Sequence, residues 1–235
     1  MKFLGRKLRH EQKYYIHPHE YITLRQQLSL LLRLDGNSQN REGYGIRSLY
    51  FDGPHDHALY DKTNGIFSRE KYRIRIYNGS DRVIKLERKS KYGDYVSKEA
   101  ASLTRETYDR LLQGDSGCLK EAGIPLLQDF YRALQRGYRP AAIVDYVREA
   151  YVYEPGDVRI TFDKKLSAGV NTFDLFDPAL VLIEALDQPR MILEIKFNEF
   201  LPDVIRKLAL PTAANRSAIS KYVICREVCI RHFKA

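Results

Sequence analysis

The sequence predicts an α+β protein in which an antiparallel β-sheet closes into a barrel, with helices packed on the outside. Segments rich in Ile, Val, Tyr, Phe and Thr are separated by short turns, a pattern typical of strands joined as hairpins. Within these strands, charged residues alternate with apolar ones. Because successive side chains of a strand point to opposite faces, one face of the sheet is charged and the other apolar. Closing the sheet with its charged face inward gives a barrel with a basic lumen, and helices then cover the apolar outside.

Strands account for most of the predicted elements, and helices are few. Turn residues at Asn78, Gly79 and Gly93 tolerate positive φ, so the strands on either side should pair antiparallel. The chain has no linker, repeat or low-complexity tract, which predicts a single domain over residues 1–235. We expect strands near 10–16, 46–52, 71–78, 82–91, 94–101, 141–153, 157–166, 179–186 and 190–197, and helices over 18–34, 104–113, 118–135, 201–210 and 217–230.

The composition indicates a polyanionic partner. The 235 residues include 39 Lys and Arg against 30 Asp and Glu, a net charge of +9, which suits nucleic acid, an acidic membrane surface or a phosphate-rich small molecule. No apolar run approaches the roughly 20 residues of a membrane-spanning helix, and the N-terminus lacks the apolar segment of a secretory signal. We therefore expect a cytoplasmic protein without a membrane span. Cys225 and Cys229 are one helical turn apart and are expected to be a buried structural pair.

The charged strand positions suggest the chemistry. A solvated sheet face would explain the alternation in any one strand, but at least five strands place Arg or Lys with an acidic residue at their centre. Arg and Lys facing one cavity suit phosphate oxygens. Burying so many cations is costly without an anion, so the lumen should be wet and should receive a polyanionic ligand.

Two carboxylates in this basic pattern are candidate metal ligands. Glu194 and Glu87 can supply hard oxygen ligands for Mg²⁺ or Mn²⁺, and the alternative is an internal salt bridge to Lys196 or Lys89. Nothing matches a P-loop, a dinucleotide-binding glycine motif or a nucleophile elbow. The histidine pairs at 17 and 19 and at 55 and 57 stand at element boundaries and are expected on the surface.

Nine short motifs, taken together and in order, resemble the VTC-domain family of polyphosphate polymerases. This family is a branch of the triphosphate tunnel metalloenzymes, which also include the CYTH-type triphosphatases. Each motif is weak alone, but their order over nearly the whole chain is specific. The motifs are HEQKYY (10–15), RSLYFD (47–52), REKYRIR (69–75), KLERK (85–89), SKE (97–99), YVR (146–148), RITFD (159–163), LEIK (193–196) and SKY (220–222).

The resemblance implies an antiparallel tunnel barrel that binds ATP with Mn²⁺ or Mg²⁺ and transfers its γ-phosphoryl group to polyphosphate or orthophosphate. Glu194 would then bind the metal ion, and Tyr146 would lie near the nucleotide. The first strand has a single E-x-K rather than the E-x-E-x-K of the CYTH triphosphatases, which favours a polymerase. Carried over by motif, phosphate binding falls to Lys13, Arg73, Arg75, Lys85, Lys98, Arg148, Arg159, Lys196 and Lys221.

Two other functions compete with this one. An inorganic or nucleoside triphosphatase could use the same barrel, with water in place of the polyphosphate end. A non-catalytic module could bind polyphosphate or RNA. The sequence argues against sequence-specific recognition of nucleic acid. Its arginines alternate with Ile and Leu and not with aromatic residues that could stack on bases, and the chain has no RNP-type motif.

Overall fold

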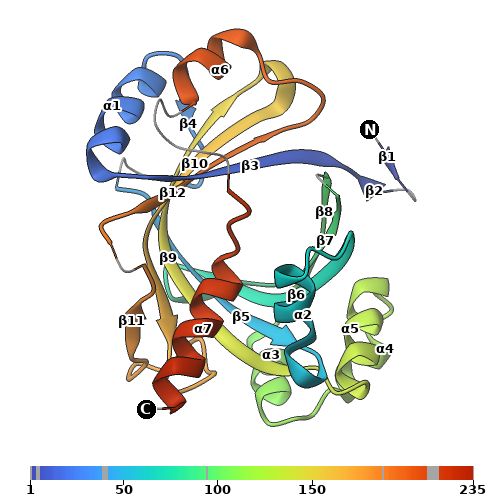
Figure 1. The fold of residues 1–235 in the computed structure, drawn as a ribbon. Coiled ribbons are helices and arrows are strands. Elements are labelled where there is room, and N and C mark those ends of the chain that lie inside the picture. Colours follow the sequence, from blue (N-terminus) through green and yellow to red (C-terminus); the bar gives the residue numbers. More distant parts are fainter. Residues whose placement is uncertain are drawn as a thin grey trace.

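Eight antiparallel strands form a closed barrel in the computed structural model, which describes residues 2–3, 6–38, 42–93, 95–186, 188–210 and 217–234 (Figure 1). Neighbouring strands follow the order β10-β12-β3-β8-β7-β6-β5-β9, and pairing of β9 with β10 closes the ring. This confirms the predicted barrel. Its strands are β3 (Arg9–Ile16), β5 (Tyr44–Asp52), β6 (Ser68–Tyr77), β7 (Ser80–Tyr92), β8 (Tyr95–Leu103), β9 (Arg139–Tyr153), β10 (Val158–Gly169) and β12 (Met191–Phe197).

Short turns fix the register of the consecutive strands. Between β6 and β7, Asn78 and Gly79 adopt φ values of 52° and 66°, the left-handed conformation that a two-residue hairpin turn requires and that Gly adopts without strain. Ile74 consequently stands opposite Leu86, and Arg73 opposite Glu87. Both apolar residues have no exposed surface, so the alternation read from the sequence places the charged members of these strands on the inner face.

The remaining elements surround the barrel. β11 (Leu182–Glu184) extends β10, β4 (Arg33–Leu34) pairs with β9, and β1 (Lys2–Phe3) pairs with β2 (Arg6–Lys7). The helices are α1 (Pro18–Ser29), α2 (His57–Thr63), α3 (Arg105–Leu112), α4 (Gly117–Glu121), α5 (Pro125–Gln135), α6 (Asp203–Ala209) and α7 (Lys221–Lys234), with 3-10 turns at Pro54–Asp56 and Pro155–Asp157.

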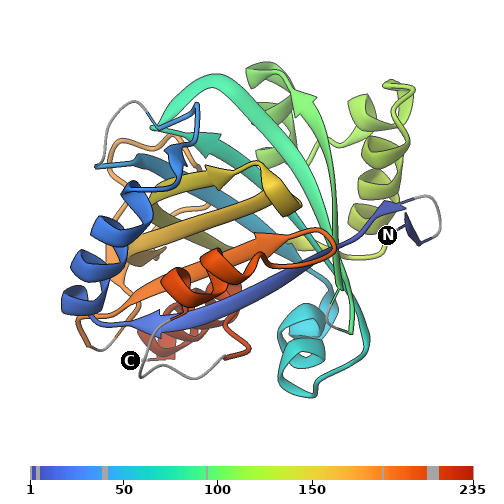
Figure 2. The same ribbon diagram turned by 90° about the horizontal axis from the view of Figure 1, so that it is seen from above.

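The hydrophobic core lies between the barrel wall and the helices, as the predicted apolar outer face requires. One cluster packs α1 and α6 against β10 and β12, through residues such as Leu28 and Phe162. A second packs α3, α4 and α5 against β6 and β7, and it includes the fully buried Phe130. A third packs α7 against β9 and β10 and includes Cys225 and Cys229. Figure 2 shows α1 and the α4–α5 pair on different sides of the barrel. Burial of these apolar faces supplies the main driving force for folding.

Several element boundaries differ from those expected. The predicted helix over 118–135 is two helices, because Gly123 adopts φ +66° and Pro125 starts a new helix. The first helix ends at Ser29 instead of residue 34, and the predicted strand over 179–186 is reduced to β11. The sequence prediction also missed α2, whose first turn is capped from outside the helix. The carboxylate of Asp52 accepts hydrogen bonds from the backbone N–H groups of Ala58 (2.6 Å) and Leu59 (3.2 Å).

Across the part of the chain that the structure describes, no helix combines the length and apolar character needed to span a membrane. Both Cys225 and Cys229 are buried free thiols, as predicted.

Candidate functional site

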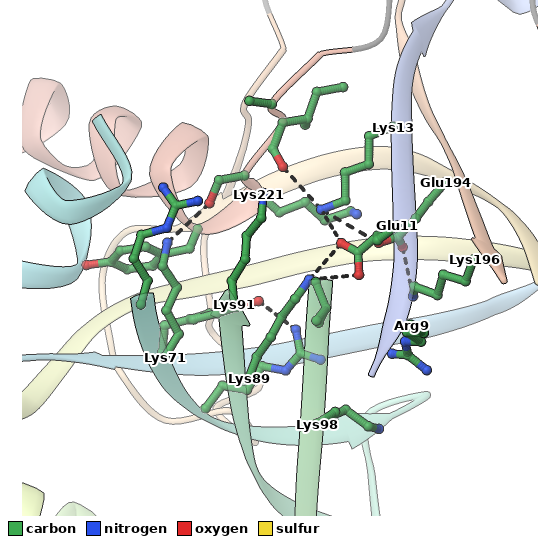
Figure 3. Close-up of a pocket in the computed structure, with 18 of the residues that line it drawn as sticks. Arg9, Glu11, Lys13, Lys71, Lys89, Lys91, Lys98, Glu194, Lys196 and Lys221 are labelled. Carbon is green, nitrogen blue, oxygen red and sulfur yellow. Dashed lines mark hydrogen bonds and ion pairs between the residues drawn. The ribbon is translucent and has the colours of Figure 1, made fainter. Parts of the chain in front are cut away.

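The barrel encloses a cavity of about 430 Å³ whose described lining is dominated by cations (Figure 3). Thirteen of the 23 lining residues are Arg or Lys, and Glu11 and Glu194 are the carboxylates among them. Lining residues come from all eight strands of the barrel and from the chain that enters α7. The cations are Arg9, Lys13, Arg69, Lys71, Arg73, Arg75, Lys89, Lys91, Lys98, Arg148, Arg159, Lys196 and Lys221.

Glu87 organises one wall of the cavity from behind. Its carboxylate has no exposed surface and accepts a hydrogen bond from Arg73 Nε at 2.8 Å and one from Lys98 Nζ at 2.7 Å, and Arg75 Nη1 lies 3.7 Å away. Burial opposes its ionisation, but Arg73, Arg75 and Lys98 outweigh burial and hold the pKa of Glu87 well below its usual range. Hydroxyl groups hold the two arginines as well: Arg73 Nη1 donates to Tyr50 (2.7 Å), and Arg75 donates to Ser48 (3.1 Å) and Tyr146 (3.2 Å). Of the two predicted metal ligands, Glu87 is the one that does not line the cavity.

Glu194 lies on the opposite wall and does line the cavity. Lys196 Nζ is 3.0 Å from its Oε2, Arg148 Nη2 is 3.2 Å from the same oxygen, and Lys13 Nζ is 3.6 Å from Oε1. The salt bridge to Lys196 that the sequence offered as the alternative to a metal site is thus present. Burial, which opposes ionisation, is overcome by these cations, so the pKa of Glu194 lies well below its usual range and the side chain is a carboxylate at neutral pH.

A second carboxylate stands beside Glu194. Register places Lys196 opposite Glu11 and Glu194 opposite Lys13, so the two carboxylates are diagonal neighbours on β12 and β3. Glu11 lies between Lys13, whose Nζ is 3.0 Å away, and Lys89, whose Nζ is 2.7 Å away (Figure 3). Although burial opposes it, this pairing lowers the pKa of Glu11 to about 2. Two ionised carboxylates therefore face the lumen side by side.

Asp163 fixes a third group of cations. It has no exposed surface and receives two hydrogen bonds from Arg148, from Nε at 2.7 Å and from Nη2 at 2.8 Å. Lys221 Nζ lies 2.5 Å from its Oδ2. A bidentate pair of this kind fixes the plane of a guanidinium. Tyr146 is adjacent, because Arg148 and Lys221 both stack over its ring, at 5.3 and 5.1 Å from the ring centroid.

The chain leading into α7 closes part of the lumen. The backbone N–H of Ser217 donates to the carbonyl of Lys13 (2.9 Å), and Lys13 Nζ donates to the carbonyl of Ile219 (3.1 Å). One turn further on, the hydroxyl of Tyr222 donates to Asp52. These contacts hold the start of α7 against β3 and β5, so that Lys221 reaches the cavity.

The structure brings together most of the residues predicted for phosphate binding. Lys13, Arg73, Arg75, Lys98, Arg148, Arg159, Lys196 and Lys221 all line the same cavity, as does Tyr146. Arg159 donates to the hydroxyl of Tyr44 (3.0 Å) and pairs with Asp35 (2.9 Å). Lys85 stands opposite Arg75 in the β6–β7 register but does not line the cavity.

Sequence reasoning did not assign six lining residues that carry charge: Arg9, Glu11, Arg69, Lys71, Lys89 and Lys91. All six occupy the same alternating positions as assigned residues, and Glu11 and Arg9 precede Lys13 by two and four residues. Lys71 and Arg69 precede Arg73 by two and four residues, and Lys89 and Lys91 follow Glu87 in the same way. Extending the period of two toward the strand ends would have found them.

His17, His19, His55 and His57 are all exposed, as predicted. His17 caps the first turn of α1, and His57 Nδ1 lies 3.4 Å from a carboxylate oxygen of Asp61.

Among the described residues, no group of three or more His, Cys, Asp or Glu side chains clusters in a way that could hold a metal ion. Any cation in this cavity would therefore share its coordination with ligand oxygens or water.

Fold and site together define a barrel of the triphosphate tunnel type, with a charged lumen and helices on the outside. The sequence profile of the VTC domain matches residues 8–230, and the chain therefore belongs to the VTC domain family. No curated protein sequence matches it.

Solved structures share the fold. A Vibrio parahaemolyticus protein for which an adenylate cyclase activity is suggested superposes with a TM-score of 0.52 at 13% identity, covering 93% of this chain and 97% of that one. The PH1012 protein of Pyrococcus horikoshii superposes with a TM-score of 0.50 at 11% identity, covering 92% of this chain and 98% of that one.

Proposed function

We propose that this protein is a polyphosphate polymerase, which transfers the γ-phosphoryl group of ATP to the end of a polyphosphate chain inside the barrel. The observation that carries the proposal is the cavity lining, with thirteen Arg and Lys residues against two lining carboxylates. Buried cations need compensating anions. A triphosphate and the end of a second phosphate chain, bound together, would supply more of that charge than a triphosphate alone.

In phosphoryl transfer, the main tasks of the protein are to position the phosphates and to neutralise charge on the transferred group. Arg73 and Arg148 suit this task, because Glu87 and Asp163 fix their guanidinium planes from behind, and Arg75 is held by hydrogen bonds to Ser48 and Tyr146. The acceptor, a terminal phosphate oxygen, is already ionised, so no general base is needed. We assign phosphate binding to the predicted residues that line the cavity, and place the nucleotide near Tyr146.

A divalent cation, Mn²⁺ or Mg²⁺, fits the acidic side of the cavity. Glu194 is the candidate ligand, with the carboxylate of Glu11 as its neighbour, because both are ionised and both line the lumen. Carboxylate oxygens are the donors that these hard ions prefer, and phosphate oxygens would complete the coordination. Such an ion would neutralise charge on the phosphates and orient them. Glu87 is better suited to positioning Arg73, Arg75 and Lys98, which occupy its oxygens.

Product analysis tests the proposal. Purified protein incubated with ATP and Mn²⁺ should form polyphosphate chains that stain on a gel and disappear on treatment with an exopolyphosphatase. Release of free phosphate without chains would replace the polymerase with a triphosphatase on the same barrel. Unchanged ATP would leave a polyanion-binding module as the function.

A further inference from the structure

Lys71 differs in its partners from the cations around it. On β6 it stands directly opposite Lys89 on β7, and its ammonium points into the cavity (Figure 3). Its contacts are the hydroxyl of Ser220 (3.4 Å) and the face of the Tyr222 ring, 4.7 Å from Nζ to the centroid. Within the described part of the chain, no carboxylate forms an ion pair with it, whereas Arg73, Lys89 and Lys98 each have one.

Most of the charged groups that face Lys71 are positive. Lys89 of β7, Arg69 of its own strand and Lys13 of β3 all disfavour its ammonium form. Asp52 of β5 is the acidic group nearby, but its carboxylate is already bound to backbone N–H groups at the start of α2 and to the hydroxyl of Tyr222 of α7. Burial together with these cations lowers the pKa of Lys71 to about 7. A substantial part of the Lys71 population is therefore neutral near physiological pH.

We propose that Lys71 is the anion-binding residue of a second phosphate subsite, and that this subsite takes up a proton together with the phosphate group it binds. The subsite lies at the end of the cavity where the register places Arg69 opposite Lys91, and both Lys91 and Arg9 opposite Val96. Arg9, Arg69 and Lys91 line the cavity there and are its other cations. An anionic oxygen beside Lys71 would supply the missing counter-charge and return its pKa toward the ordinary 10.5. The inference rests on the proposed function, because it assigns this end of the cavity to the acceptor phosphate chain.

Calorimetry with a linear polyphosphate of about 20 phosphates tests the subsite. Binding is measured at pH 8 in two buffers of different ionisation enthalpy, which yields the number of protons taken up. One pH unit above a pKa of about 7, roughly a tenth of Lys71 is protonated, so full protonation in the complex adds about 0.9 proton.

The matched variant is Lys71→Arg, which keeps the positive charge but does not titrate in this range. It should bind polyphosphate and take up fewer protons than the wild type, by up to about 0.9. Lys71→Met should lose the same proton and bind more weakly, which provides a second variant if the arginine does not fit. Lys207→Arg, on the exposed surface of α6, should match the wild type.

Equal proton uptake by wild type and both Lys71 variants would overturn the inference, as would a failure of the wild type to bind polyphosphate. The outcome of the polymerase assay can be distinguished from the outcome of this calorimetric test. Polyphosphate synthesis without Lys71-dependent uptake would overturn the second subsite alone. Lys71-dependent uptake without synthesis from ATP would retain the subsite and overturn the polymerase.

Discussion

Removing Arg73 should destabilise the fold as well as abolish turnover, because the arginine compensates a buried charge. In Arg73→Ala, Glu87 loses its contacts at 2.6 and 2.8 Å and remains buried with Lys98 at 2.7 Å and Arg75 at 3.7 Å. Removing one partner of a buried ion pair costs about 3–5 kcal/mol. Since Lys98 still neutralises part of the charge, we expect the free energy of unfolding to fall by the lower end of this range, about 3 kcal/mol. For a chain of this size, this lowers Tm by roughly 6–12 °C.

Differential scanning calorimetry of three variants tests this reasoning. Arg73→Ala with Glu87→Gln should recover part of the lost stability, because the uncompensated carboxylate is gone and Lys98, whose side chain is 35% exposed, can be hydrated. Arg105→Ala breaks an exposed ion pair with Asp109 and should cost less than about 1 kcal/mol. The account is wrong if Arg73→Ala unfolds at the wild-type temperature, or if the double variant is less stable than Arg73→Ala.

Three further outcomes are expected. Glu194→Gln keeps the shape of the side chain but removes its charge, so activity and Mn²⁺ affinity should fall sharply while triphosphate still binds. Overlapping curves of activity against Mn²⁺ concentration for wild type and variant would refute the assignment of Glu194 as a metal ligand. Asp163→Asn should reduce kcat by at least tenfold by releasing Arg148 and Lys221, measured by ATP turnover, and an unchanged kcat would remove Asp163 from the site. The folded pKa of Lys71, about 7, lies below its ordinary 10.5, so the unfolded chain binds more protons between these values and stability should rise with pH there. Lys71→Met should flatten that rise by up to about 1.4 kcal/mol per pH unit in urea unfolding between pH 7 and 9, and parallel curves would contradict the assigned pKa.

The sequence was sufficient to predict the barrel and the inward face because both depend on local signals. Alternation in β6 places Arg73 and Arg75 on one face and Ile74 on the other, whatever the neighbouring strand is. Helix boundaries were harder to predict, since they depend on single residues. Gly123 ends α4 by its positive φ, and Asp52 caps α2 from the end of a strand.

The partners of the charged residues could not be predicted in the same way. Arg148 and Asp163 meet only because β9 and β10 pair in one register, and Glu194 meets Lys13 only because β12 pairs with β3. From alternation alone, all lumen cations look alike. The register brings many of them to Glu87, Asp163 or the Glu11–Glu194 pair, whereas Lys71 forms no ion pair with a carboxylate among the described residues.

The fate of the γ-phosphoryl group tests the central claim most directly. The protein is incubated with ATP, Mn²⁺ and a short polyphosphate primer in water enriched in ¹⁸O, and the products are separated and analysed by mass spectrometry. Transfer to a phosphate oxygen inside the barrel predicts longer chains whose new phosphate groups contain no ¹⁸O. Orthophosphate carrying one ¹⁸O per ATP consumed, with no lengthening of the primer, would show that water is the acceptor and would contradict the polymerase.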